Sequence, residues 1–129
     1  MNKLDKESVI GISALLVHAA NIDEIYSEHE KDLIKDFIRS YLNDEDASNI
    51  LEKSEKIESN SNQLLNYTNI IKQNSMEIKK DIIEHLWKVI ISDNSIDQYE
   101  ANLMRRICGL IYFPDKESAE IKLKLLNEK

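Results

Sequence analysis

The chain has 129 residues and a net charge of −7, with only two glycines and one proline. A chain of this length fits one domain and can bury a core without disulfides or metal ions to hold it together. So few turn-forming residues exclude the many tight turns of a β-sandwich or barrel, and they exclude glycine-rich phosphate-binding loops. We therefore expect a single all-α domain over residues 1–129.

The charge balance and the single cysteine narrow the functional classes further. Acidic residues outnumber basic ones by 24 to 17, which argues against nucleic acid or anionic lipid as the main partner. Cys108 stands alone, so an internal disulfide and a multi-cysteine zinc site are excluded. No apolar run reaches the roughly 18 residues of a membrane span, and the charged first residues are not typical of a signal peptide. We expect a cytoplasmic protein that is not itself inserted in a membrane.

Apolar residues recur at helical spacing, and seven segments of the chain have this pattern. The first helix is expected over about residues 6–21, with Asp5 as its N-cap. The second helix follows Ser27, because the Ser27 hydroxyl and the Glu30 carboxylate have the spacing of a capping box. Its apolar stripe makes it one of the clearest amphipathic helices in the chain.

The remaining helices are predicted by the same signals. The third is highly charged and begins at Asn43 or Asp44. Ser75 and Asp97 are expected to cap the fifth and sixth helices, and Glu100 stands three residues after Asp97 in the capping-box spacing. We expect these five helices over about residues 43–59, 64–73, 75–92, 97–111 and 116–127.

Two parts of the chain resemble each other when one is shifted by 70 positions. Helix caps, carboxylates and the phase of the apolar residues all coincide in this alignment. The repeat predicts two similar helix–loop–helix units, related by a pseudo-two-fold axis, within a compact bundle of about seven helices. The matching pairs are Ile12 and Ile82, Leu16 and Leu86, Asp23 and Asp93, Glu30 and Glu100, and Leu33 and Leu103.

Carboxylates gather at the two breaks between the paired helices. Oxygen ligands at a helix break can hold a hard divalent cation such as Mg²⁺, Ca²⁺ or Mn²⁺. The same residues can instead cap helices, because free backbone amides and the helix dipole stabilise carboxylates there. The pattern is not an EF-hand, since Gln98 and Met104 stand where that loop needs glycine and glutamate. The candidate metal ligands are Asp23, Glu30, Asp93, Asp97 and Glu100.

The histidines, the cysteine and the tryptophan can each have a structural role instead of a functional one. His18 lies one turn before Asp23, where it can bond that carboxylate, support a metal ion, or favour the helix C-terminus by its charge. His85 is expected to be exposed. Cys108 falls within an apolar stripe and is expected to be a small core residue. Trp87 is either a core residue or an exposed anchor for a partner.

Most of the chain resembles a known family. The stretch LLVHAANIDEIYSEHEKDLIKDFI resembles the first half of the TerB-like (tellurite resistance protein B) domain, and LWKVIISDNSIDQYEANLMRRICGLI resembles its second half. The stretch LLNYTNIIKQNSMEIKKDIIEHLWKV fits the region between them. The resemblance implies an all-helical fold, often of seven helices, and a link to tellurite and general stress responses. It also implies metal binding by the acidic loops. Related domains occur in membrane-anchored co-chaperones, and no catalytic reaction defines the family.

The chain departs from the family pattern at both breaks. The family usually has Asp-Gly there, whereas Asp23 is followed by Glu24 and Asp93 by Asn94. Asparagine adopts a left-handed backbone at low cost, and glutamate does not. We therefore expect the first break either to differ in shape from the family pattern or to bind no ligand.

These observations favour a non-enzymatic stress-response domain that presents its acidic breaks to a divalent cation or a protein partner, including a membrane-associated one. The alternative is a ligand-free interaction or homodimerisation module. Its contact surface would be an apolar groove formed by Trp87 and the last helix. The residues expected in that groove from the last helix are Ile121, Leu123, Leu125 and Leu126. A metal-assisted hydrolase would instead need several of the acidic residues in one deep pocket.

Overall fold

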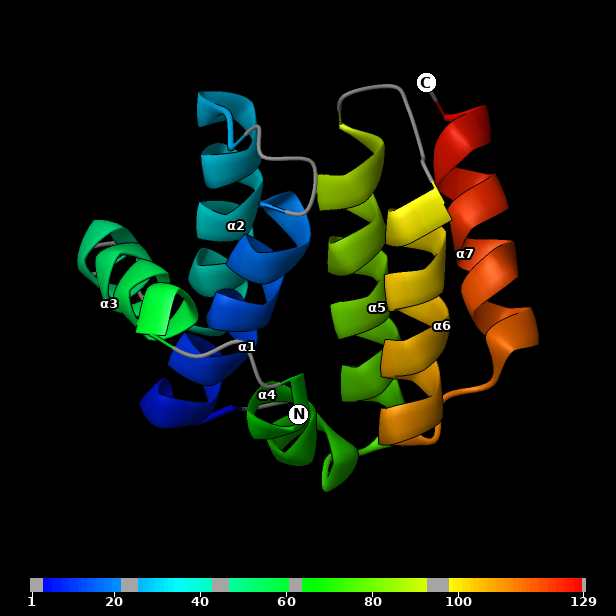
Figure 1. Cartoon of the computed structure of the whole chain (residues 1–129), viewed down its shortest axis with the longest axis horizontal. Helices are drawn as coiled ribbons and strands as arrows, with labels where there is room; N and C mark the ends of the chain where they lie inside the picture. Colours follow the sequence, from blue (N-terminus) through cyan, green and yellow to red (C-terminus); the bar gives the residue numbers. More distant parts are fainter. Residues whose placement is uncertain (1–3, 22–25, 43–46, 61–63, 93–97, 129) are drawn as a thin grey trace.

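The computed structural model describes residues 4–21, 26–42, 47–60, 64–92 and 98–128. Within these ranges all regular secondary structure is helical, so the predicted all-α fold is confirmed. The described residues form seven helices (Figure 1): α1 (Lys6–Ala20), α2 (Glu28–Tyr41), α3 (Ala47–Asn60), α4 (Leu64–Lys72), α5 (Met76–Ile91), α6 (Gln98–Ile111) and α7 (Asp115–Asn127).

The predicted caps at the starts of three helices are confirmed. The Asp5 carboxylate accepts the Ser8 backbone N–H at 2.8 Å at the start of α1. Ser27 and Glu30 form the expected capping box at the start of α2. The Ser75 hydroxyl accepts a backbone N–H at the start of α5. Asp97, the cap predicted for α6, lies outside the described residues.

One predicted helix start lies outside the described residues, and another differs by one residue from the prediction. The structure describes α3 from Ala47, and the predicted start at Asn43 or Asp44 lies outside the described residues. The last helix begins at Asp115, one residue earlier than expected. Pro114 occupies its N-cap without a side-chain hydrogen bond. Proline is tolerated at this position because the backbone N–H that it lacks would precede the helix and have no helical partner.

Helix α1 lies at the centre of the bundle and packs against α2, α3, α4 and α5. It is apolar around most of its circumference, as a helix with neighbours on several sides must be. Helices α1 and α5, which begin the two predicted units, contact each other, as the predicted packing of those units requires. Helix α3 lies at one flank of the molecule, and α7 lies at the other, where it packs on α5 and α6 (Figure 1).

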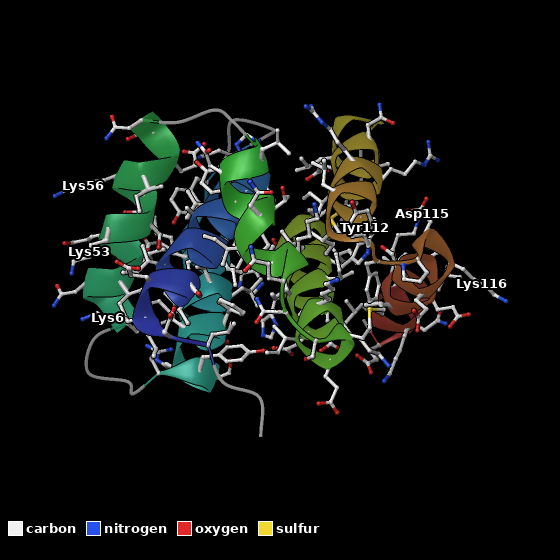
Figure 2. The ribbon with its side chains drawn as sticks, turned by 90° about the horizontal axis from the view of Figure 1, so that it is seen from below. Lys6, Lys53, Lys56, Tyr112, Asp115 and Lys116 are labelled. Atoms are coloured by element: carbon white, nitrogen blue, oxygen red, sulfur yellow. The ribbon has the colours of Figure 1, made fainter. Side chains whose placement is uncertain are left out.

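Helix α6 ends in a Schellman motif that turns the chain towards α7. The Phe113 N–H donates to the Cys108 carbonyl at 2.9 Å, and the Tyr112 N–H donates to the Gly109 carbonyl at 3.4 Å. Tyr112 has a φ of 60°, a left-handed conformation that glycine usually adopts at this position. Its ring is largely exposed (Figure 2) and lies 5.0 Å from the Lys72 ammonium, which gives it a cation–π contact.

No helix in the described part of the chain is both long enough and apolar enough to cross a membrane. The buried apolar residues form a single core that draws on all seven helices. Cys108 belongs to this core, as predicted. Burial raises the pKa of the Cys108 thiol, which therefore stays protonated and unreactive at neutral pH.

Candidate functional site

The helix ends that flank the two acidic breaks lie at the same end of the molecule (Figure 1). The C-terminal ends of α1 and α5 and the N-terminal ends of α2 and α6 all lie at this end (Figure 1). The predicted ligands Asp23, Asp93 and Asp97 lie outside the described residues. The structure therefore places the helix ends on both sides of each break, together with Glu30 and Glu100.

Glu30 and Glu100 occupy equivalent places in the first turns of α2 and α6. Both side chains are buried, with exposed fractions of 5% and 3%. The Glu30 carboxylate accepts the Ser27 backbone N–H at 2.8 Å, and the Ser27 hydroxyl accepts the Glu30 N–H at 3.1 Å. This reciprocal pairing satisfies two backbone donors at the helix start. Glu30 is therefore a helix cap, which is one of the two alternatives that the sequence left open.

The described residues do not assemble a metal site by themselves. Within the described ranges, no three His, Cys, Asp or Glu side chains converge closely enough to hold an ion. Glu30 and Glu100 therefore do not have enough neighbouring ligand side chains, among the described residues, to hold a metal ion. A cation site at this end would need carboxylates from the three aspartates outside the described residues.

Two carboxylates of α3 form hydrogen bonds to residues on both sides of the first break. The sequence pattern did not indicate this role. Glu58 accepts a hydrogen bond from the Asn21 side chain at 3.2 Å and lies 3.3 Å from the His18 Nδ1. Glu55 accepts the Tyr26 hydroxyl at 2.7 Å. The last residue before the break and the first described residue after it are therefore both tied to α3. His18 pairs with Glu58, whereas its predicted bond to Asp23 involves a residue outside the described ranges.

The hydrogen bond between Tyr26 and Glu55 keeps its direction over the whole physiological pH range. Burial raises the pKa of the Tyr26 phenol well above its usual range, and the bond to Glu55 raises it further. The phenol thus stays protonated and remains a hydrogen-bond donor to Glu55. Glu55 and Glu58 stand three residues apart, so they lie on one face of α3. That spacing was the only signal in the sequence for their shared role.

A second polar cluster joins α2 to α5, and it corrects the expectation that His85 is exposed. The Tyr41 hydroxyl donates to the Asp81 carboxylate at 2.6 Å, and the His85 Nδ1 lies 2.8 Å from the Asp81 backbone oxygen. Only 13% of the His85 side chain is exposed, because its ring packs edge-on against the Phe37 ring, with 5.1 Å between the ring centroids. The prediction was wrong because α2 covers this part of α5, which the pattern of α5 alone does not reveal.

The apolar groove expected on the last helix is also corrected. Trp87 and Ile121 are buried in the core, and the Trp87 indole N–H donates to the Ser118 hydroxyl at 2.9 Å. Trp87 is therefore a core residue, and the hollow of about 280 Å³ that it borders between α6 and α7 does not include Leu123, Leu125 or Leu126. Leu123 and Leu126 remain exposed, so the accessible apolar surface of α7 is smaller than predicted.

Comparison with known proteins identifies the family. The sequence profile described as tellurite resistance protein TerB matches residues 10–123, which include both acidic breaks. Searches of curated proteins and of solved structures gave no match. The match extends over most of the chain and agrees with the all-α fold of the described residues. The chain therefore belongs to the TerB family.

Proposed function

We propose that this chain is a non-enzymatic, cytoplasmic stress-response domain of the tellurite-resistance type that presents an acidic surface at one end of its bundle. This acidic surface comprises Asp23, Asp93 and Asp97, with Glu30 and Glu100 at its base. Its ligand is a divalent cation, for which Mg²⁺, Ca²⁺ and Mn²⁺ are the candidates because they prefer oxygen donors. A protein partner, including a membrane-associated one, would dock on the same surface.

The observation that carries this proposal is the common position of the four helix ends. The breaks are 70 residues apart in the sequence, yet the helix ends on either side of them lie at one end of the molecule (Figure 1). Carboxylates from both breaks can then bind one cation. A single break offers only one or two carboxylates, which is too few to bind a cation tightly. A hard cation of this kind takes six or more oxygens, several of which can come from water.

The acidic residues divide into two roles in this proposal. Glu30 is committed to the Ser27 backbone and fixes the first turn of α2. The equivalent position of Glu100 suggests the same duty in α6, since it is equally buried there. In this proposal the three aspartates supply the ligands, and the glutamates hold the starts of α2 and α6 in place.

A titration of the full chain with each cation, followed by amide NMR and calorimetry, tests the proposal. The variant D93N/D97N removes two charges, and asparagine caps a helix as well as aspartate does. The matched control E117Q/E120Q removes two charges from exposed positions on α7. We expect saturable binding to the native chain and the control, and its loss in D93N/D97N at unchanged stability. Absence of saturable binding to the native chain would contradict the cation proposal.

One observation favours the alternative of a ligand-free interaction or homodimerisation module. Leu123 and Leu126 are exposed on α7, with exposed fractions of 56% and 39%, and they lie three residues apart on one helical face. If this surface mediates dimerisation, L123S/L126S yields a monomer from a native dimer in sedimentation experiments. A native chain that is monomeric at high concentration would contradict the dimer version.

A further inference from the structure

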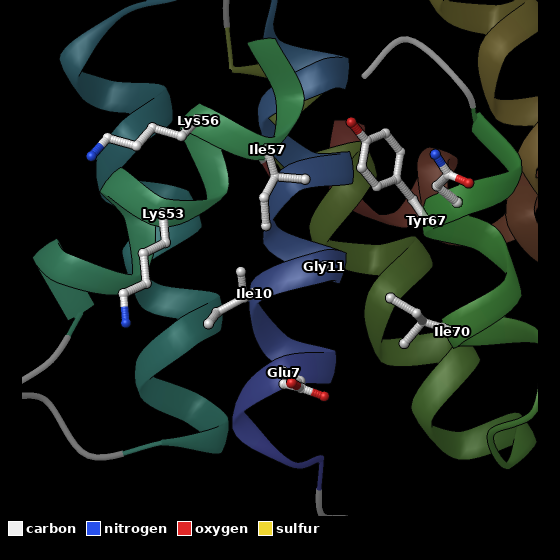
Figure 3. Close-up of a pocket in the computed structure, with 9 residues that line it drawn as sticks. Glu7, Ile10, Gly11, Lys53, Lys56, Ile57, Tyr67 and Ile70 are labelled. Carbon is white, nitrogen blue, oxygen red and sulfur yellow. The ribbon is translucent and has the colours of Figure 1, made fainter. Parts of the chain in front are cut away.

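An open groove lies between α1, α3 and α4, away from the proposed acidic surface (Figure 3). Its volume is about 580 Å³, within the range of about 300–1,000 Å³ that is usual for small-molecule sites. Its apolar walls are formed by Ile10 and Gly11 of α1, Ile57 of α3, and Tyr67 and Ile70 of α4. No residue predicted from the sequence as a ligand or partner contact belongs to this groove.

The floor of the groove is formed where α1 and α4 approach closely. A Cβ atom added at Gly11 would lie within 2.4 Å of the Ile70 side chain, so glycine makes this approach possible. Figure 3 shows the side chains of Ile10, Ile57 and Ile70 around Gly11. Ile57 keeps 40% of its surface exposed, although it borders other apolar side chains. The groove therefore leaves an apolar surface open to a ligand.

The outer edge of the groove is basic. Lys53 and Lys56 of α3 line it, and Lys6 of α1 lies on the same side of the molecule (Figure 2). In the part of the chain that the structure describes, neither Lys53 nor Lys56 forms an ion pair. Glu7 is the one carboxylate among the lining residues. The edge therefore has an excess of positive charge in a chain whose net charge is −7.

Two neighbouring carboxylates of α3 point away from the lysines, and a third, Glu52, is exposed one turn before Lys56 but forms no ion pair with it in the described structure. Glu55 and Glu58 are engaged by Tyr26, His18 and Asn21 at the first break. Glu55 and Glu58 therefore face the break, whereas the Lys53 and Lys56 side chains border the groove with their ammonium groups directed outward from its apolar walls (Figure 3). An anionic group at the groove edge would gain two partners without displacing an existing ion pair.

We propose that this groove binds a free fatty acid, with its acyl chain against Ile10, Ile57 and Ile70 and its carboxylate at Lys53 and Lys56. An apolar groove with a cationic edge matches a ligand that has an apolar chain and one anionic end. An anionic bilayer fits less well, because the net negative charge of the chain opposes approach to such a surface. This inference is independent of the proposed cation site.

Binding of dodecanoate to the full chain, measured by amide NMR and calorimetry below its micelle concentration, tests the proposal. We expect saturable shifts at the groove residues. Butyrate has the same head and almost no tail, and dodecyltrimethylammonium has the same tail and the opposite charge. Both should bind at least about tenfold more weakly, which corresponds to about 1.4 kcal/mol. Equal binding of the cationic amphiphile, or no saturable binding of dodecanoate, would overturn the proposal.

A pair of charge reversals tests the role of the lysines. K53E/K56E should weaken dodecanoate binding about tenfold or more. The matched control K116E/K124E reverses two exposed lysines on α7, and Lys116 lies on the opposite side of the molecule (Figure 2). The control should bind within about twofold of the native chain, and circular dichroism should show both variants folded. Equal weakening by both pairs would mean that only overall charge matters, which would overturn the assigned head-group site.

A second matched pair of variants tests the apolar part of the groove. I57D places a carboxylate in the groove, whereas L123D makes the same change at an exposed leucine of α7. We expect I57D to abolish dodecanoate binding and L123D to leave it unchanged.

Two further measurements distinguish other occupants. Sedimentation with phosphatidylglycerol vesicles that requires Lys53 and Lys56 would reassign the groove to a membrane surface. An acidic amphipathic peptide that shifts the groove residues at lower concentration than dodecanoate would reassign it to a protein partner. Either result would overturn the fatty-acid assignment.

Discussion

The flanks of the two acidic breaks are held in different ways. On the first break, Asn21 and Tyr26 are bonded to Glu58 and Glu55 of α3, so a third helix holds both sides. On the second break, the bonds described for Ser92 stay within α5, where its hydroxyl donates to the Val89 carbonyl at 2.7 Å. Two units that match in the phase of their apolar residues thus differ, among the described residues, in the support of the helix end that precedes each break. The difference shows that a repeat can preserve the core of a unit while its surroundings diverge.

The largest expected effect tests whether the two cores are equivalent. Leu16 and Leu86 are the matching positions of the repeat, and both side chains are completely buried. Leu16→Ala and Leu86→Ala should each lower the free energy of unfolding by about 2–5 kcal/mol, through lost burial and the cavity left behind. Urea denaturation measures both. A cost below about 1 kcal/mol at either position would show that the two cores are not equivalent.

The next effect tests the support of the first break. Glu58→Ala removes the partner of both His18 and Asn21, and it should cost about 1–3 kcal/mol because part-buried polar groups lose their hydrogen bonds. Hydrogen exchange should become faster at the end of α1. Glu52→Ala, at an exposed position of the same helix, is the control and should cost less than about 0.5 kcal/mol. Equal losses of stability in the two variants would contradict the support of the first break by Glu58.

Glu30 allows the cap and the ligand role to be separated. Glu30→Ala removes the bond to the Ser27 N–H and should cost about 1 kcal/mol. Glu30→Gln keeps an acceptor at the same place, so stability should stay within about 0.5 kcal/mol of the native chain. Cation affinity should also survive Glu30→Gln if the aspartates are the ligands. A large loss of affinity in that variant would make Glu30 a ligand rather than a cap.

The smallest effects concern the glycine of each unit. Gly109 has open space around its missing side chain, so Gly109→Ala should stabilise the chain by about 0.5–1 kcal/mol. Gly11→Ala should gain less, because the Ile70 methyl group must move away from the new Cβ. Ile70→Val removes that methyl group, and a double-mutant cycle with Gly11→Ala should show a favourable coupling. Equal increases in stability from both glycine substitutions would show that the close packing of α1 on α4 does not disfavour a side chain at position 11.

Local signals explain which parts of the fold could be predicted. Asp5, Ser27 and Ser75 cap helices through bonds to residues three positions away, so the sequence spacing reveals them directly. The bond between Tyr26 and Glu55 spans 29 residues and depends on how α3 packs. His85 was misplaced for the same reason, since Phe37 of another helix covers it.

The candidate site shows the same division. The carboxylates at the helix breaks and the capping role of Glu30 could be anticipated from spacing. The groove between α1, α3 and α4 could not, because Lys53 and Ile57 stand in a charged helix whose pattern gives no sign of a neighbouring cavity. Its existence depends on the approach of α4 to Gly11, which is a tertiary contact.

Paramagnetic broadening by Mn²⁺ tests the central claim most directly. With a small amount of Mn²⁺ added to the ¹⁵N-labelled chain, amide signals within reach of the bound ion broaden. If both breaks form one acidic surface, the signals of Asn21 and Tyr26 and those of Ser92 and Gln98 should broaden together, with one affinity, and D93N/D97N should abolish the effect. Broadening at only one break, or at neither, would contradict a shared cation site at this end of the bundle.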